Sequence, residues 1–184
     1  MEQGEILTPP GTIDTCGKTH VGKVREHNED QFFVASLYKS MDLLHTSLEQ
    51  VTAFEETQQA KAYIFVVADG VGSTGGGRIA SDMAVQALVT YITRTMGCFY
   101  TYDIETEHEF IEQLEAAVEH AHQSILDTFS SKGRGPATTL TIATMIWPRV
   151  YLVHVGDSRA YYLRKGRLRQ ITRDQTMAEL MIDQ

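Results

Sequence analysis

The segment VVADGVGSTGGGRIAS, residues 66–81, sets one carboxylate, Asp69, between an apolar run and a loop that contains five glycines. A carboxylate beside flexible backbone can bind a hard cation such as Mg²⁺ or Mn²⁺, and the carbonyl oxygen of Gly70 can add a second ligand. A single aspartate at the end of a strand is more often a turn former or a helix cap. Asp69 by itself therefore leaves both interpretations open.

Two further segments place acidic residues beside apolar strands. VREHNED holds Arg25, Glu29 and Asp30 within six residues, and HVGDSR holds Asp157 and Arg159. Taken separately, the first is a solvated turn and the second a hairpin turn. Three acid-bearing turns that each adjoin a strand predict a shared rim of carboxylates.

The glycine loop also fits a nucleotide-binding pattern, because Gly70, Gly72 and Gly75 match GxGxxG between a strand and a helix. Two features disfavour that interpretation. Asp69 would repel a pyrophosphate, and the loop is followed by two helical segments without a second parallel strand. A nucleotide-binding module is therefore the weaker hypothesis.

Two other motifs fail on single positions. A phosphate-binding P-loop requires Lys and then Ser or Thr after the last glycine, whereas Gly77 is followed by Arg78. A zinc-binding helix requires a second histidine four residues after His108, and that position holds Glu112.

The hydrophobic pattern predicts the elements that must position these residues. Strand composition and helical spacing alternate along the first 130 residues, and a period of two follows. We expect strands at 11–16, 31–38 and 61–68, a short helix within 39–60, and helices at 78–96 and from Thr106 to about 130, with Thr106 and Glu109 as a capping box. We also expect hairpins turning at Pro148-Arg149 and Lys165-Gly166, and a helix starting at Asp174.

Composition excludes several classes of protein. The 184 residues, 42% hydrophobic and 22% charged, fit one globular domain. The longest apolar run, AYIFVVA, is too short for a membrane span, and the N-terminus has no export signal. Cys16 and Cys98 lack metal-type spacing and indicate free thiols in a cytoplasmic protein.

Charge is distributed unevenly along the chain, whose net charge is −8. Residues 101–130 contain eight acids and no Lys or Arg, which is typical of a solvated helix face. Residues 149–173 contain seven Lys or Arg against Asp157 alone. This basic stretch can attract phosphate groups, but few aromatic residues interleave with it, so we expect no nucleic-acid partner and no membrane partner.

Taken in order, VREHNED, VVADGVGSTGGGRIAS, ATTLTIATMI and HVGDSRAYYLRKGRLRQITRDQT resemble the type 2C (PPM-type) metal-dependent protein serine/threonine phosphatases, in their bacterial form. The resemblance spans roughly residues 12–180. It implies an α+β fold, a sandwich of two antiparallel β-sheets flanked by α-helices. Residues 1–10 are then a flexible N-terminal arm, and residues 11–184 are the N-terminal portion of a phosphatase-like catalytic domain.

The resemblance also implies roles for individual residues. Asp69 looks like the aspartate that bridges two Mn²⁺ or Mg²⁺ ions, and Gly70 like the residue whose carbonyl binds one of them. Glu29 and Asp30 look like acids that bind metal directly or through water, and Asp157, similarly, like a ligand of an additional, weaker ion. Arg25 looks like the arginine that grips the substrate phosphate.

The resemblance implies hydrolysis of phosphoserine and phosphothreonine in proteins by a metal-activated water, in opposition to a serine/threonine kinase. Val71 stands where some members carry a histidine, and two further aspartates of the family pattern have no counterpart before Gln184, so we expect a domain without its C-terminal elements. The alternative is a non-catalytic module that binds phosphoproteins through Arg25 and the basic stretch.

Overall fold

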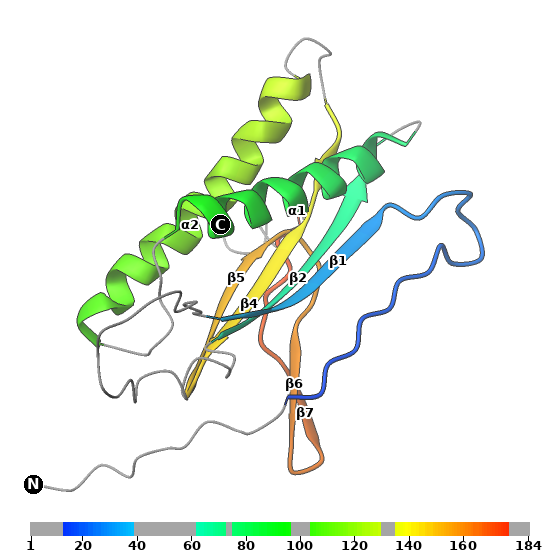
Figure 1. The fold of residues 1–184 in the computed structure, drawn as a ribbon. Helices are drawn as coiled ribbons and strands as arrows, with labels where there is room; N and C mark the ends of the chain where they lie inside the picture. Colours follow the sequence, from blue (N-terminus) through cyan, green and yellow to red (C-terminus); the bar gives the residue numbers. More distant parts are fainter. Residues whose placement is uncertain (1–12, 39–61, 73–74, 97–103, 130–134, 177–184) are drawn as a thin grey trace, which may run out of the picture.

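The computed structural model describes residues 13–38, 62–72, 75–96, 104–129 and 135–176. Two helices lie on one face of an antiparallel sheet, and a separate two-stranded ribbon projects on the side away from the helices (Figure 1). None of the described helices is long and apolar enough to cross a bilayer.

The sheet has five strands in the order β1-β2-β4-β5, with the short β3 paired to the end of β2. Its strands are β1 (Asp30–Leu37), β2 (Ala62–Val71), β3 (Ala137–Thr138), β4 (Leu140–Ile146) and β5 (Arg149–Val155). The ribbon consists of β6 (Tyr161–Arg164) and β7 (Arg167–Gln170). All pairings are antiparallel, and β2 pairs with β1 on one side and with β3 and β4 on the other.

The helices are α1 (Gly76–Arg94) and α2 (Ile104–Phe129). The residue before α1, Gly75, has φ 78°, a left-handed conformation that glycine adopts without steric cost. This conformation turns the chain sharply from the end of β2 into α1.

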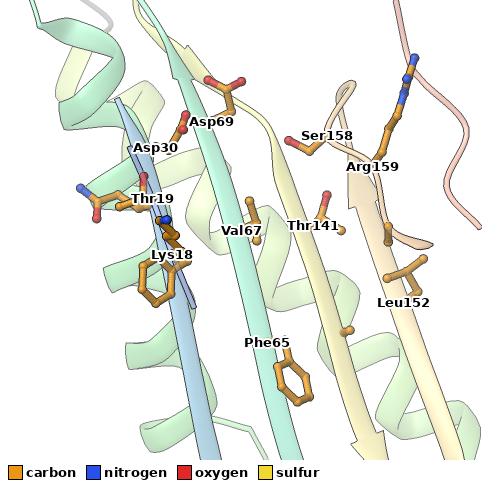
Figure 2. Close-up of a pocket in the computed structure, with 14 residues that line it drawn as sticks. Lys18, Thr19, Asp30, Phe65, Val67, Asp69, Thr141, Leu152, Ser158 and Arg159 are labelled. Carbon is orange, nitrogen blue, oxygen red and sulfur yellow. The ribbon is translucent and has the colours of Figure 1, made fainter. Parts of the chain in front are cut away.

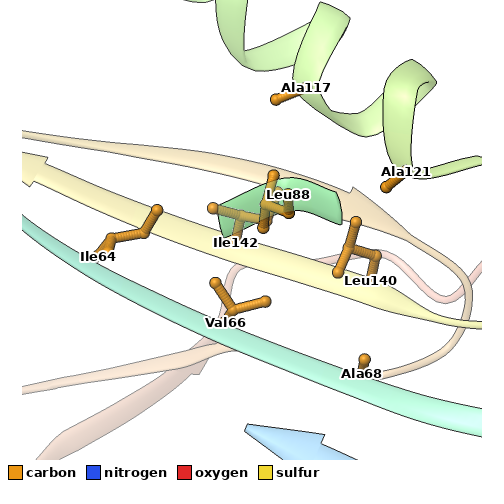
Figure 3. Packing of buried hydrophobic residues seen from close by; sticks show 8 residues of the cluster. All are labelled: Ile64, Val66, Ala68, Leu88, Ala117, Ala121, Leu140 and Ile142. Carbon is orange, nitrogen blue, oxygen red and sulfur yellow. The ribbon is translucent and has the colours of Figure 1, made fainter. Parts of the chain in front are cut away.

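The core lies between the sheet and the two helices (Figure 3). Leu88 of α1 is fully buried between Ile142 of β4 and the alanines of α2, Ala117 and Ala121. Small side chains one turn apart let α2 approach closely. Replacing Leu88 by Ala would cost about 2–5 kcal/mol, because it would leave a cavity in this layer.

Side chains of β2 alternate between the two faces of the sheet. Ile64 and Val66 are buried beneath the helices, at 2% and 1% exposure, whereas Val67 is 47% exposed on the opposite face. We call this opposite side the open face. Asp69 follows Val67 in the same alternation and lies on the open face.

The α+β class, with antiparallel sheets and flanking helices, is confirmed, and within the described residues the second sheet is the β6-β7 ribbon. One hairpin turns where expected, at Lys165-Gly166. The other turns at Trp147-Pro148, one residue earlier than expected, because Arg149 already belongs to β5 and pairs with Ile146. The arm at 1–10 and the helix within 39–60 lie outside the described residues.

Four other element predictions were wrong in part. Residues 13–16 form no strand. The strand expected to stop before Asp69 continues to Val71, because Gly70 and Val71 pair with β3. Helix α2 begins at Ile104, so Thr106 lies inside the helix and not at the N-cap position that the predicted capping box requires. The described residues from Asp174 to Thr176 are not helical.

Candidate active site

Asp30 and Asp69 are direct partners across the first strand pair of the sheet. Asp30 is the first residue of β1, and its register position is opposite Asp69 near the end of β2. Figure 2 shows the two carboxylates side by side at the same end of the open face. Like charges placed opposite each other destabilise a sheet, so a proton or a cation bound by the two carboxylates would stabilise this pair.

The pKa of the Asp69 carboxyl is raised by the same arrangement. Partial burial contributes most, followed by the negative charge of Asp30 and a hydrogen bond to it, and then by the charges of Asp157 and Glu29. Four carboxylates therefore influence one another at this end of the sheet, and a divalent cation would offset their repulsion.

Backbone hydrogen bonds hold Asp69 from the side opposite Asp30. Its amide donates to the Thr139 hydroxyl at 3.0 Å, and its carbonyl accepts the Thr139 amide at 2.8 Å and the Thr138 hydroxyl at 3.0 Å. Thr139 lies at the break between β3 and β4, so these bonds connect Asp69 to a third strand. The main chain of Asp69 is thus fixed on both sides.

Two glycines bring the end of β2 against the start of α1. A Cβ at Gly77 would lie 2.6 Å from the carbonyl carbon of Gly70, and a Cβ at Gly70 would collide with the carbonyl group of Gly77. No side chain fits in either place. At these two positions the glycines allow the backbones of β2 and α1 to pack closely next to Asp69.

The segment that carries Glu29 and Asp30 is also anchored. The buried Ser81 hydroxyl of α1 donates to the Glu29 carbonyl at 2.6 Å, and the Gly70 amide donates to the same oxygen at 3.2 Å. The Asp30 amide donates to the Asn28 side chain at 3.1 Å. These bonds fix the main chain from which both acidic side chains project.

The loop after β5 reaches the same region through Ser158. The Ser158 hydroxyl lies 2.7 Å from that of Thr139, next to the exposed Asp157. Figure 2 shows Ser158 across the sheet from the Asp30 and Asp69 carboxylates. Asp157 is therefore brought near Asp69, although it comes from the far edge of the sheet.

A cleft of about 530 Å³ collects most of the residues predicted from the sequence. Its lining includes Arg25, Glu29, Asp30, Asp69 and Gly70. The Arg25 guanidinium is exposed at this cleft, and no carboxylate among the described residues pairs with it. It is thus available to an anion that enters the cleft.

A second hollow, of about 410 Å³, lies on the open face and shares Asp30 and Asp69 with the cleft (Figure 2). Its lining is mixed, with Phe65, Val67 and Leu152 below the carboxylates. Arg159 borders it but is already occupied, because its guanidinium forms a forked ion pair with Asp174 at 2.5–3.0 Å.

The donor set fits a hard divalent cation in part. Carboxylate and carbonyl oxygens are what Mg²⁺ and Mn²⁺ prefer, and Asp30, Asp69 and Gly70 offer them at one point. Within the described ranges, no three His, Cys, Asp or Glu side chains converge into a closed metal site. The described residues thus supply a carboxylate pair with two outlying acids.

Sequence reasoning missed the residues that position this pair. Thr139, Ser158 and Ser81 make the connecting hydrogen bonds, but no role was predicted for these hydroxyl residues, two of which lie within HVGDSR and VVADGVGSTGGGRIAS. The sequence indicated these residues only through their positions, since Thr139 begins an apolar strand and Ser158 follows Asp157.

The family model described as Protein phosphatase 2C matches residues 52–179. The serine/threonine protein phosphatase PstP of Mycobacterium tuberculosis is 33% identical over 132 residues, covering 71% of this chain and 24% of that protein. The serine/threonine phosphatase stp of Listeria innocua is 28% identical over 166 residues, covering 90% of this chain and 56% of that protein.

Two crystal structures of PstP show the same fold. One aligns with a TM-score of 0.60 at 29% identity, covering 88% of this chain and 55% of that chain. The other, of the catalytic domain with two manganese ions, aligns with a TM-score of 0.53 at 25% identity, covering 84% and 60%. The chain belongs to the protein phosphatase 2C family. It spans no more than about 60% of the relatives and structures that it matches here.

Proposed function

We propose that this protein contributes to the metal-dependent hydrolysis of phosphoserine and phosphothreonine in proteins. The observation that carries the proposal is the pair of carboxylates, Asp30 and Asp69, which face each other across β1 and β2 and form no ion pair with a Lys, Arg or His of the described residues. A PstP structure that contains two manganese ions supports the choice of cation.

Each predicted site residue has a role in this proposal. Asp69 would bind both of two Mn²⁺ or Mg²⁺ ions, and Asp30, Glu29 and the Gly70 carbonyl would be further ligands. Asp157, in the loop after β5, would hold a third, weaker ion. When bound, such ions lower the pKa of a water molecule and offset charge on the phosphoryl oxygens.

The chain's own residues bind and orient the phosphate. Arg25 donates two parallel hydrogen bonds to phosphoryl oxygens and so aligns the ester with the carboxylate pair. Val71, an exposed apolar residue, can donate no proton to the leaving alkoxide. That proton therefore comes from water.

We infer that the substrates are phosphorylated proteins in the cytoplasm and that the enzyme opposes a serine/threonine kinase in a signal-transduction pathway. The relatives described above are all named as phosphatases, and none of them supports the non-catalytic alternative.

The test is Mn²⁺-dependent release of phosphate from a phosphothreonine peptide. A chelator and Asp69→Ala should each abolish it, whereas the control Glu115→Gln, an exposed carboxylate on α2, should leave it unchanged. Arg25→Ala should raise KM more than it lowers kcat, because the arginine binds phosphate in the ground state. Activity retained in Asp69→Ala would refute the mechanism.

A further inference from the structure

The β6-β7 ribbon has one basic face. Arg164 pairs with Arg167 across the strands, and Tyr162 pairs with Arg169. Directly paired residues, and residues two apart on one strand, share a face, so all four side chains lie on the same side. With Lys165 of the turn they line a hollow of about 340 Å³. We call these five residues the basic face.

The opposite side of the ribbon is apolar. It carries the Leu163–Leu168 pair, with Tyr161 opposite Gln170. Every residue of both strands is exposed, and the ribbon makes few contacts with the main sheet. The ribbon therefore presents its basic face to solvent rather than to another described element.

The four cations of the basic face have no carboxylate partner among the described residues. Arg164 and Arg167 lie directly opposite each other, which costs stability in the same way as the Asp30–Asp69 pair. The hairpin itself does not need them, because Lys165 (φ 51°) and Gly166 (φ 71°) form a tight turn of the type that hairpins favour. An anion bound on this face would relieve the repulsion.

The ribbon is firmly attached to the loop that carries Asp157 and Ser158. The forked Arg159–Asp174 ion pair closes its base. The Ile171 amide donates to the Ala160 carbonyl at 2.9 Å, and the Ala160 amide donates to the Thr172 hydroxyl at 3.0 Å. A ligand held on the basic face is consequently tethered to the candidate active site.

We infer that the basic face docks an acidic segment of the protein substrate. An extended peptide rises by about 3.4 Å per residue, as a strand does, so the four-residue strands match about four residues of such a peptide. A nucleic acid would need a longer basic track and more stacking rings than Tyr162. The inference rests on the proposed function, because it names the substrate class of that site.

Fluorescence anisotropy tests the docking directly. The probe is a labelled phosphothreonine peptide flanked by Asp and Glu, and its comparison is the same peptide with Asn and Gln. We expect the acidic peptide to bind at least about tenfold more tightly, and the difference to shrink as salt screens the charges. Equal affinity for the two peptides would overturn the inference.

Substitutions locate the binding. The double variant R167E/R169E should lose the preference for the acidic peptide, and R167Q/R169Q should weaken it by several-fold. The matched control Arg94→Glu, an exposed arginine at the end of α1, should stay within about twofold of wild type. Circular dichroism checks that each variant is folded. A preference retained in both double variants overturns the inference.

Two further measurements separate the possible failures. The first measurement is competition with a short single-stranded oligonucleotide. If the oligonucleotide binds more tightly than the acidic peptide, displaces it and loses affinity in R167E/R169E, the basic face is a nucleic-acid site instead. Mn²⁺-dependent hydrolysis of p-nitrophenyl phosphate does not use the basic face. If the wild-type protein binds the acidic peptide but does not hydrolyse p-nitrophenyl phosphate, the result counts against the proposed function and not against the docking surface.

Discussion

The hydroxyl groups of Thr139 and Ser158 lie 2.7 Å apart and connect the two strand ends that carry Asp69 and Asp157. The same Thr139 oxygen accepts the Asp69 amide at 3.0 Å. Since Thr139 is only 7% exposed, water does not compete strongly for these bonds. The two hydroxyls therefore set the spacing between two of the proposed metal ligands.

Thr139→Val should destabilise the protein by about 1–3 kcal/mol, because the Asp69 amide loses a buried acceptor. Thr139→Ser keeps the hydroxyl and should recover most of this loss. Urea unfolding measures the stability, and calorimetric titration with Mn²⁺ measures the metal affinity. A valine variant that matched the serine variant in both measurements would show that the hydroxyl positions nothing.

Asp30→Asn should have opposite effects with and without metal. In EDTA, removing one of two facing charges should raise the free energy of unfolding by roughly 0.2–1 kcal/mol. With Mn²⁺, the variant should show a smaller rise in Tm than wild type, because a ligand is missing. Wild-type affinity for Mn²⁺ should itself be weak, since one or two carboxylates hold a hard ion poorly.

The same variant predicts a change in pH dependence. The pKa of Asp69 is raised on folding, so its contribution to stability is present below its unfolded pKa and is lost as pH rises through the folded pKa. Without Asp30 a part of that loss should disappear, whereas the part caused by burial of Asp69 should remain. Thermal unfolding in EDTA from about pH 3 to pH 7 measures it, and an unchanged profile would contradict the coupling of the two carboxyls.

Gly77→Ala should be strongly destabilising, by about 1–3 kcal/mol or more, because the added methyl group meets the Gly70 carbonyl carbon at 2.6 Å. Gly76→Ala is the matched control in the same turn of α1. Its methyl group would lie 3.2 Å from Pro136, and alanine favours the helix by about 1 kcal/mol. Similar chemical denaturation midpoints for the two variants would argue against the close approach of β2 and α1.

Arg159→Lys should loosen the base of the β6-β7 ribbon, because an ammonium cannot form the forked pair with Asp174. Hydrogen bonds from Arg159 hold the pKa of Asp174 below its usual range, so this contribution to stability is present above the unfolded pKa and is lost as pH falls through the folded pKa. NMR titration should show the pKa of Asp174 rising in the variant. Hydrogen exchange at the Ile171 amide should become faster.

Local sequence features predicted much of this fold. Period-two alternation marked β4 and β5, and Lys165-Gly166 marked the tight turn. The strand that ends at Val71 was misjudged because Asp69 and Gly70, which are disfavoured in strands, interrupt its apolar run. Gly70 and Val71 are extended because β3, about 65 residues later, pairs with them.

The residues of the candidate site also fall into those that the sequence predicted and those that it did not. Residue type and resemblance identified Arg25, Glu29, Asp30, Asp69 and Gly70, and the structure places these five around one cleft. The supporting hydroxyls could not be found from the sequence, because a serine or threonine gains its role from a partner distant in the chain. Ser81, for example, bonds the carbonyl of a residue 52 positions earlier.

The alternation of β2 has a consequence for engineering. Ile64, Val66 and Ala68 are locked under the helices, while Phe65, Val67 and Asp69 point away from them. A combinatorial library that varied Phe65 and Val67 and kept Asp69 would reshape the open face beside the Asp30–Asp69 pair with little disturbance to the helix-covered layer. Shifting the same library by one residue would instead scramble that layer, and few of its members would express.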